Sequence, residues 1–258
     1  SLLTPTMFQM LLEASVPGHD LSSLKTIAYG GAPSTPDLIG RVQEAFPTVD
    51  LHHVYGGTEA AVVLHLGPDE HHAGLLDSVG REISGVEVKL VDEAGVDVPN
   101  GAPGELTIRS NELLTGYWGD TEATAEALRD GYYWSGDLGI RDELGYIRLV
   151  GRRTDVVISG GFNVYPIEVE NVLAGNPEIS EVAVIGLPHQ RWGEAVHAVV
   201  VRTPGSTVPA EELLNFCTGR IASYKRPKSV EIVDELPRTS VGKVAKNVLR
   251  EERLGTPG

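Results

Sequence analysis

Residues 132–138 have the sequence Tyr-Tyr-Trp-Ser-Gly-Asp-Leu, followed after a short hairpin pattern by Gly-Arg-Arg-Thr-Asp at 151–155 and by the pair Gly160-Gly161. The carboxylate of Asp137 and the guanidinium of Arg152 are groups that could hold a ribose phosphate, as acidic residues do in other nucleotide sites. Taken alone, Asp137 is better explained as a hairpin residue that hydrogen-bonds to its own backbone. We expect one domain before this segment and another after it.

The composition limits the class of protein. At 258 residues the chain can form one large or two modest domains, and we expect two. No apolar run approaches the roughly 20 residues of a membrane span, so we expect no transmembrane helix. A single cysteine favours a reducing compartment, and we expect a cytoplasmic location. The net charge of -15 argues against nucleic-acid binding, which depends on Lys and Arg. The single cysteine, Cys217, excludes an internal disulfide, and its apolar helical pattern favours a core residue over a nucleophile.

The first 80 residues have an α/β pattern. We expect helices at 7–14 and from Pro36 onward, and strands at 24–29 and 49–54. Thr35 can cap the second helix, and Pro36 suits its first turn. Strand, glycine turn, helix and strand in this order are typical of a parallel sheet, where ligands bind at the carboxyl ends of the strands. Both Gly30-Gly31 and Tyr55-Gly56-Gly57 lie at such ends.

The rest of the chain changes character twice. Residues 81–153 have alternating strands, such as 86–90 and 106–109, broken by Gly and Pro turns, which predicts a β-rich subdomain. Residues 154–258 predict a small α+β domain, with a helix opening at Pro166, strands at 182–185 and 196–201, a helix at 209–222 and a basic helix from Val244. The predicted domains are therefore 1–153, with an α/β portion at 1–80 and the β-rich portion at 81–153, and 154–258.

The segment Tyr55-Gly56-Gly57-Thr58-Glu59 offers several functions just past a strand. A tyrosine face can stack on a base, glycines allow close backbone approach, the Thr58 hydroxyl can donate to phosphate, and the Glu59 carboxylate can bind Mg²⁺. An ordinary strand-end turn is the favoured explanation of this segment alone. Gly30-Gly31-Ala32-Pro33 could form a backbone shelf beside it, although a plain turn explains that segment almost as well.

Lys243 follows Gly242 in a polar loop ahead of the final helix. A Walker phosphate loop is excluded, because Val244 replaces the required Ser or Thr. The lysine could instead deliver positive charge to a phosphoryl transition state, although most lysines are solvated at the surface. The histidine pairs His52-His53 and His71-His72 lack the spacing of a zinc site, which favours solvated or hydrogen-bonded histidines over metal ligands.

Singly these segments are weak signals, but their order and spacing resemble the adenylate-forming superfamily, which contains acyl-CoA synthetases, luciferases and peptide-synthetase adenylation domains. The matching blocks are Gly30–Pro33, Tyr55–Glu59, Tyr133–Leu138, Gly151–Glu170 and Leu236–Lys243. The resemblance covers essentially all of the chain. Residues 159–166 and 224–227 look most like AMP-forming acyl-CoA synthetases.

The resemblance implies a two-step reaction. A carboxylic acid attacks the α-phosphate of ATP and releases pyrophosphate, and the thiol of CoA then displaces AMP from the acyl-adenylate. By matched position, adenine would be held by Gly31, Ala32 and Tyr55 with His53 near its edge, and the ribose by Asp137 and Arg152. Thr58 would contact phosphate, Glu59 would bind Mg²⁺, and Lys243 would bridge the acyl carboxylate and the α-phosphate. CoA would be bound by Gly160, Gly161 and Lys225. Thr154 stands at the family's hinge position, often Asp or Lys, about which the small domain rotates between the steps.

The family's loop for the β- and γ-phosphates has no counterpart in these 258 residues. We therefore expect the chain to be the C-terminal portion of a longer enzyme, with the missing N-terminal part needed for full activity. An enzyme that loads a carrier-protein thiol and a non-catalytic binding module of the same fold stay open, as does a homodimer. The run 60–63, Ala-Ala-Val-Val, could indicate an apolar acyl or aryl acid, or it could be part of a core strand.

Overall fold

The computed structural model describes residues 1–14, 20–239 and 242–255. They fall into two compact units, Ser1–Leu149 and Val150–Gly258. This division lies slightly before the boundary at 153/154 that the sequence predicts. Within the described ranges, none of the helices is both long and apolar enough to pass through a bilayer.

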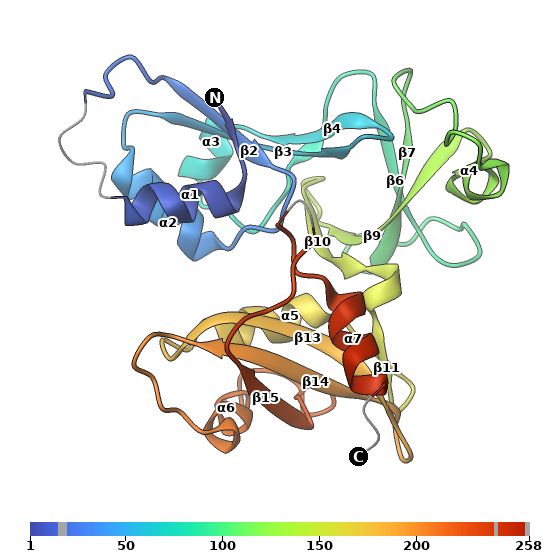
Figure 1. Cartoon of the computed structure of the whole chain (residues 1–258). Coiled ribbons are helices and arrows are strands. Elements are labelled where there is room, and N and C mark those ends of the chain that lie inside the picture. The colour runs from blue at the N-terminus through green and yellow to red at the C-terminus, as the bar shows by residue number, and fades with distance from the viewer. Residues whose placement is uncertain (15–19, 240–241, 256–258) are drawn as a thin grey trace. The chain divides into compact units, whose positions relative to one another are not determined.

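The first unit opens with a sheet of strand order β1-β2-β3-β4-β5, in which β1 to β3 are parallel and β4 and β5 are antiparallel additions. Its elements are β1 (Leu2–Leu3), α1 (Pro5–Glu13), β2 (Thr26–Gly30), α2 (Pro36–Ala45), β3 (Asp50–Gly57), β4 (Ala61–Leu66), α3 (Pro68–His72) and β5 (Arg81–Glu82). The helices α1 and α2 pack together and share a core with this sheet (Figure 1). The predicted order of strand, glycine turn, helix and strand is thus confirmed.

Local caps fix where these helices begin. The Thr35 hydroxyl accepts a hydrogen bond from the backbone N–H of Leu38 at 3.2 Å, and Pro36 occupies the first turn of α2. Thr4 caps α1 in the same way, so α1 begins two residues before the predicted start at residue 7. Short side-chain caps of this kind are readable from the sequence, because they involve neighbours three residues apart.

The β-rich part of the first unit is a second sheet of order β10-β9-β7-β6, with β8 paired to β9. Its elements are β6 (Glu87–Val91), β7 (Pro103–Arg109), α4 (Thr121–Ala127), β8 (Leu128–Arg129), β9 (Tyr132–Arg141) and β10 (Ile147–Arg152). Val63 and Leu64 of β4 share one buried cluster with Leu106 and Ile108 of β7. Strand β4 of the first sheet therefore packs into the same core as β7 of the second sheet.

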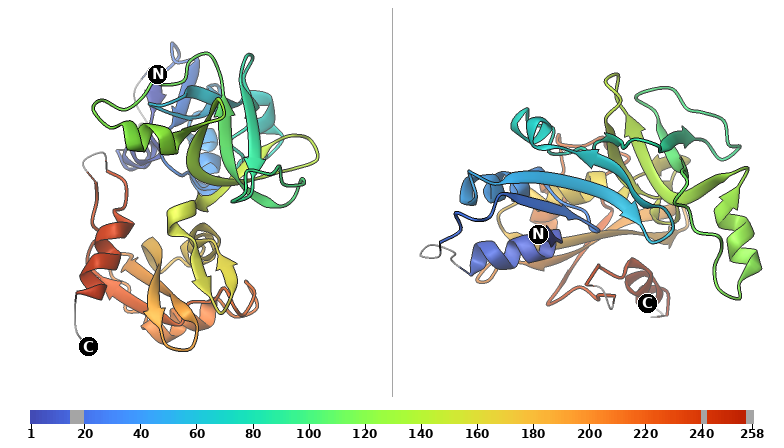
Figure 2. Two further views of the ribbon diagram at one scale, coloured as in Figure 1. Left: turned by 90° about the vertical axis from the view of Figure 1, so that its right-hand side faces the viewer. Right: turned by 90° about the horizontal axis from the view of Figure 1, so that it is seen from above.

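The second unit is a sheet of order β12-β11-β14-β13, with β15 parallel to β14. Its elements are the 3-10 turn η1 (Arg153–Asp155), β11 (Val157–Ser159), β12 (Phe162–Val164), α5 (Pro166–Ala174), β13 (Ile179–His189), β14 (Gly193–Arg202), α6 (Ala210–Phe216), β15 (Ser229–Val233) and α7 (Lys246–Leu254). Val184 and Ala198 belong to a core with α5 and α6, whereas Ala183, Val199 and Leu249 form a core with α7. Helices thus cover both faces of the sheet (Figure 1 and Figure 2), which explains why the central parts of β13 and β14, residues 182–187 and 195–201, are apolar apart from His197.

Two predicted helices have different bounds in the structure. The helix predicted at 209–222 ends at Phe216, because Gly219 adopts a φ of +78° that a continuing right-handed helix excludes. The final helix begins at Lys246 rather than Val244, since Val244 pairs with Arg238 in an isolated antiparallel bridge. Cys217 is fully buried beside α6, and its interpretation as a core residue is confirmed.

Candidate functional site

Two glycines shape the carboxyl ends of β2 and β3. A Cβ on Gly30 would lie 2.1 Å from the Val54 carbonyl oxygen, and a Cβ on Gly56 would lie 1.8 Å from the Ala61 carbonyl oxygen. Only glycine allows these backbones to approach so closely. The pairing of β3 with β4 also shifts register between Tyr55 and Gly56, which is a bulge of the kind that redirects side chains beside functional sites.

Tyr55 and Asp137 meet at this edge, although 82 residues separate them. The Tyr55 hydroxyl donates to Asp137 Oδ2 at 2.7 Å and so connects β3 with β9. Burial raises the pKa of Tyr55, and the negative charge of Asp137 raises it further, so the phenol keeps its proton at neutral pH. The two residues that the sequence assigns to adenine and ribose therefore lie in direct contact.

The backbone around Asp137 is fixed by its own strand and by β7. Gly136 has a φ of +73°, and its N–H donates to Glu105 Oε1 at 3.1 Å. The Ser135 hydroxyl donates to the Leu106 carbonyl at 2.8 Å, and it accepts from the Asp137 N–H at 3.1 Å. The Ser-Gly-Asp order thus places the carboxylate by a local bend in β9.

Thr58 and Glu59 lie in the turn between β3 and β4. Thr58 is exposed and Glu59 is half-buried. Leu114 donates its N–H to the Glu59 carbonyl at 2.7 Å, and the Tyr117 hydroxyl donates to Glu59 Oε1 at 3.1 Å. Tyr117 is a neighbour that the sequence reasoning missed, and its place in a Gly-Tyr-Trp-Gly turn is the only local signal for it.

The donor set around Glu59 suits a magnesium ion that arrives with a nucleotide. In the parts of the chain that the structure describes, no three His, Cys, Asp or Glu side chains gather to hold a metal. Mg²⁺ is often bound by one or two carboxylates, with substrate phosphates and water completing its octahedron. A single carboxylate fits that mode of binding, whereas a dedicated protein cage would need more ligands.

His52, His53 and His71 make hydrogen bonds and His72 is exposed, so both of the environments that the sequence favours occur. His53 stacks on Tyr29, with ring centroids 4.5 Å apart, and its Nδ1 donates to the Ser78 carbonyl at 3.1 Å. Burial lowers the pKa of His53 to about 4, so this side chain is neutral at pH 7. His52 and His65 share a hydrogen bond of 2.8 Å. The predicted place of His53 beside adenine stays a prediction.

The run at 60–63 is divided between core and surface. Ala60 and Val63 are buried in the cluster that joins the two sheets. Val62 is 41% exposed, and Ala61 has a φ of +54°. The core-strand interpretation therefore holds for Val63, whereas Ala60 is buried in the turn before β4, and Ala61 and Val62 are exposed.

Gly160 and Gly161 form the turn between β11 and β12. Both have positive φ, and the Gly160 N–H donates to the Trp192 carbonyl at 2.8 Å. A Cβ on Gly160 would lie 3.0 Å from the Trp192 ring, so glycine is needed there for packing as well. Trp192, which the sequence reasoning did not select, thus forms one side of the predicted CoA-binding turn.

Two contacts place Lys225 near the same turn, one made by its own side chain and one by the adjacent Tyr224. Its Nζ donates to Glu168 Oε2 at 2.6 Å, and the adjacent Tyr224 packs on Phe162 of β12 with ring centroids 4.8 Å apart. The second unit therefore brings the hairpin, the first turn of α5 and the 224–228 loop together. The resulting face carries exposed aromatic surface and a lysine.

Lys243 is exposed at the end of a short loop. Two residues of the matching block, Ser240 and Val241, lie outside the described residues. The Lys243 carbonyl accepts from the Thr239 N–H at 2.8 Å. Arg238 donates to the Gly242 carbonyl at 2.9 Å and to Glu181 Oε2 at 2.5 Å, so it ties this loop to β13.

Arg152 and Thr154 are both exposed and follow the division between the units. Arg152 is the last residue of β10, and Thr154 is the middle residue of η1. The assignment of Arg152 to the ribose and of Thr154 to the hinge stays a prediction.

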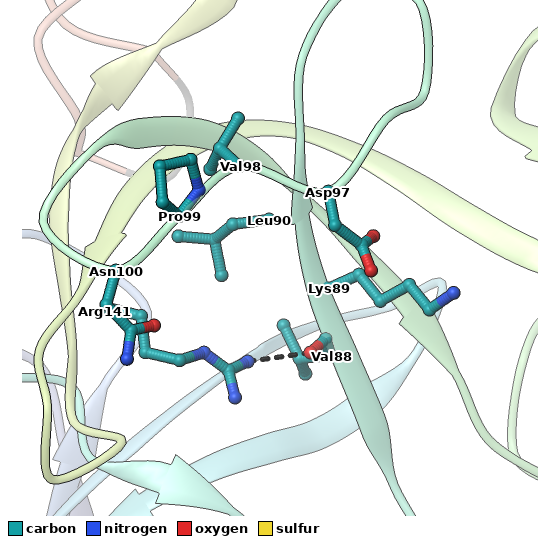
Figure 3. Close-up of a pocket in the computed structure, with 8 residues that line it drawn as sticks. All are labelled: Val88, Lys89, Leu90, Asp97, Val98, Pro99, Asn100 and Arg141. Atoms are coloured by element: carbon teal, nitrogen blue, oxygen red, sulfur yellow. Dashed lines mark hydrogen bonds between the residues drawn. The ribbon is translucent and has the colours of Figure 1, made fainter.

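Neither of two small pockets contains a predicted site residue. One, of about 220 Å³, lies between β6 and the 97–100 loop, and there Arg141 donates to the Val88 carbonyl at 2.6 Å (Figure 3). The other, of about 180 Å³, is lined by Phe46 and His71 among others.

Known proteins resemble this chain over nearly its whole length. The family models "AMP-binding enzyme" and "AMP-binding enzyme C-terminal domain" match residues 1–118 and 168–243. Feruloyl-CoA synthase of an Amycolatopsis species is 43% identical over 249 residues, which are 95% of this chain and 50% of that protein. The fatty acid–[acyl-carrier-protein] ligase ScoC of Streptomyces coeruleorubidus is 37% identical, over 98% of this chain and 49% of that protein.

Among solved structures, the amide bond synthetase McbA of Marinactinospora thermotolerans superimposes with a TM-score of 0.91 at 38% identity. The match covers 98% of this chain and 51% of that one. The chain thus spans about half the length of the curated relatives it matches.

Proposed function

This chain belongs to the family of AMP-binding enzymes, and from that premise we propose that it is the C-terminal portion of an ATP-dependent acid–thiol ligase that forms acyl-CoA. The carboxylate of the acid attacks the α-phosphorus of ATP, and pyrophosphate leaves. The thiol of CoA then attacks the acyl carbonyl, loses its proton, and AMP leaves as the thioester forms. The observation that carries this proposal is the contact between Tyr55 and Asp137 at the carboxyl end of β3.

The nucleotide would lie on the edge that Gly31, Ala32 and Tyr55 form. A tyrosine face suits stacking on adenine, and an aspartate suits the ribose hydroxyls. Because its phenol is bonded to Asp137, Tyr55 has a fixed orientation before the nucleotide arrives. Arg152 would contribute positive charge to the ribose side from the end of β10.

Thr58 and Glu59 would act on the phosphates. Thr58 presents an exposed hydroxyl that can donate to a phosphate oxygen. The Glu59 carboxylate would hold Mg²⁺, and that ion neutralises phosphate charge when it is bound. The remaining contacts to the β- and γ-phosphates would come from a loop outside these 258 residues.

Lys243 would place its ammonium group between the acyl carboxylate and the α-phosphate. An in-line displacement needs positioning and neutralisation of developing charge more than covalent help. An exposed lysine on a tethered loop supports that role, since its charge is available to an incoming ligand. Rotation at Thr154 would then exchange Lys243 for the face that Gly160, Gly161 and Lys225 present to CoA.

The acceptor is the least constrained part of the proposal. The names of the three relatives refer to CoA, an acyl carrier protein and amide bond formation, so similarity alone favours no single acceptor. CoA is supported by the close resemblance of 159–166 and 224–227 to acyl-CoA synthetases. A non-catalytic module of the same fold remains the alternative of a different class.

The test is a pyrophosphate-release assay on the full-length enzyme with a panel of aryl and fatty acids, followed by AMP release with free CoA. We expect pyrophosphate with at least one acid and AMP release that depends on CoA. Asp137→Asn should weaken AMP binding about tenfold in calorimetry, because a neutral amide forms weaker hydrogen bonds than a carboxylate. If AMP is released only with a carrier protein, CoA is not the acceptor. If no acid gives pyrophosphate, the non-catalytic module is favoured.

A further inference from the structure

We propose that Tyr117 is a positioning residue that orients the Glu59 carboxylate for the magnesium ion of the nucleotide. The proposal rests on the function proposed above, because it concerns the metal role of Glu59. It adds a residue that neither the matching sequence blocks nor the comparisons assign to the site.

The contact is specific and joins distant parts of the chain. Tyr117 lies 58 residues after Glu59, and its hydroxyl donates to Oε1 at 3.1 Å. Three residues before Tyr117, the N–H of Leu114 donates to the Glu59 carbonyl at 2.7 Å. The segment from Leu114 to Tyr117 therefore holds Glu59 by both its backbone and its side chain.

The start of α4 holds Tyr117 in turn. Its N–H donates to Thr124 Oγ1 at 2.9 Å, and the Thr124 hydroxyl donates to the Asp120 carbonyl at 2.6 Å. Asp120 caps α4 by accepting from the N–H of Ala123 at 2.9 Å. A Cβ on Gly116 would lie 3.1 Å from the Thr124 side chain, so glycine allows the loop to pack closely on the helix.

The bond to Tyr117 engages one of the two carboxylate oxygens, and the other lies beside Gly57. A Cβ on Gly57 would lie 3.2 Å from Glu59 Oε2, tighter than ordinary contact, so glycine keeps the space beside Oε2 clear. Oε1 is oriented by the phenol while Oε2 faces this space. A glutamate has several rotatable bonds, and fixing one rotamer in advance reduces the entropy lost when a metal binds.

The Tyr117 hydroxyl is the donor of this bond, because an ionised carboxylate can only accept. Hydrogen-bond partners that orient a metal ligand typically change metal affinity by roughly 10- to 100-fold when they are removed.

The experiment measures binding of ATP to the full-length enzyme by calorimetry, with and without Mg²⁺ and without the carboxylic acid. Tyr117→Phe should raise the Kd for ATP in the presence of Mg²⁺ about tenfold and leave the Kd for metal-free ATP unchanged. Thr124→Val removes the hydroxyl that accepts from the Tyr117 N–H. This variant should also raise the Kd for ATP in the presence of Mg²⁺, but by less than Tyr117→Phe does. The matched control is Tyr132→Phe, whose phenol donates to Glu87 elsewhere in the same unit at 2.8 Å, and it should behave as wild type.

Glu59→Gln separates the two proposals. If Glu59→Gln binds ATP with Mg²⁺ as tightly as wild type does, the metal role of Glu59 is wrong. If Glu59→Gln weakens binding but Tyr117→Phe does not, the positioning role of Tyr117 is wrong. Adding Tyr117→Phe to Glu59→Gln should cause no further loss, and a full additive loss would also overturn the inference.

Discussion

At the scale of single residues, His53 makes the stability of the first unit depend on pH. The unfolded chain protonates this side chain near the ordinary pKa of about 6.5, whereas burial lowers the pKa to about 4 in the folded chain. Between these values the unfolded state binds a proton that the folded state does not, so folding stability falls as the pH drops from about 6.5 to about 4. The contribution that is lost is on the order of 3 kcal/mol.

The measurement is the free energy of unfolding in denaturant at pH 7.5, 6 and 5. His53→Phe keeps a ring that can stack on Tyr29 but removes the titration, so its stability should depend less on pH than that of wild type. His72→Phe, at an exposed position, is the control and should keep the wild-type slope. Equal slopes for wild type and His53→Phe would show that the buried imidazole is not the cause.

At the scale of elements, the loop that carries Lys243 depends on Arg238. The guanidinium bonds both to the Gly242 carbonyl within the loop and to Glu181 of β13, so it connects the loop to the sheet. Arg238→Ala should slow acyl-adenylate formation about tenfold, because a misplaced ammonium loses much of its effect on the transition state. Transfer from a preformed acyl-adenylate to CoA should keep its rate, since the role proposed for Lys243 is confined to the first step.

Arg220 provides a matched control for that variant. It also lies in the second unit and also donates to a backbone carbonyl, that of Phe216 at 2.7 Å. Arg220→Ala should leave both half-reactions unchanged. Equal slowing of both half-reactions by Arg238→Ala would indicate general damage to the fold instead of a displaced lysine.

At the scale of the whole molecule, the proposed function has the second unit present first Lys243 and then the Gly160-Gly161 turn. Thr154 lies in η1, just after the division between the units. Thr154→Pro restricts φ and should spare adenylate formation while slowing thioester formation, as measured in separate half-reactions. Thr154→Ala leaves φ free to rotate, so the rates of both half-reactions should be those of wild type. Loss of both half-reactions to the same extent in the proline variant would argue against the hinge.

Much of the fold was predictable from short-range patterns. The cap at Thr35, the glycine turn after β2 and the apolar runs of β13 and β14 all depend on neighbours a few residues apart. Sterics and side-chain periodicity act over that distance, so a single sequence carries the signal. The end of α6 was missed because an apolar helical pattern continues to the residues around Gly219, where the backbone becomes left-handed.

By itself the sequence placed Tyr55 near the end of a strand, and the resemblance of its ordered segments to adenylate-forming enzymes gave Tyr55 and Asp137 their expected places at a nucleotide. Only the tertiary structure decided that these two side chains touch, that Tyr117 bonds to Glu59, and that Val244 pairs with Arg238 and delays the last helix. The physical reason is that such contacts depend on strand register and loop packing across the whole unit. A pattern of nearest neighbours along the chain does not contain them.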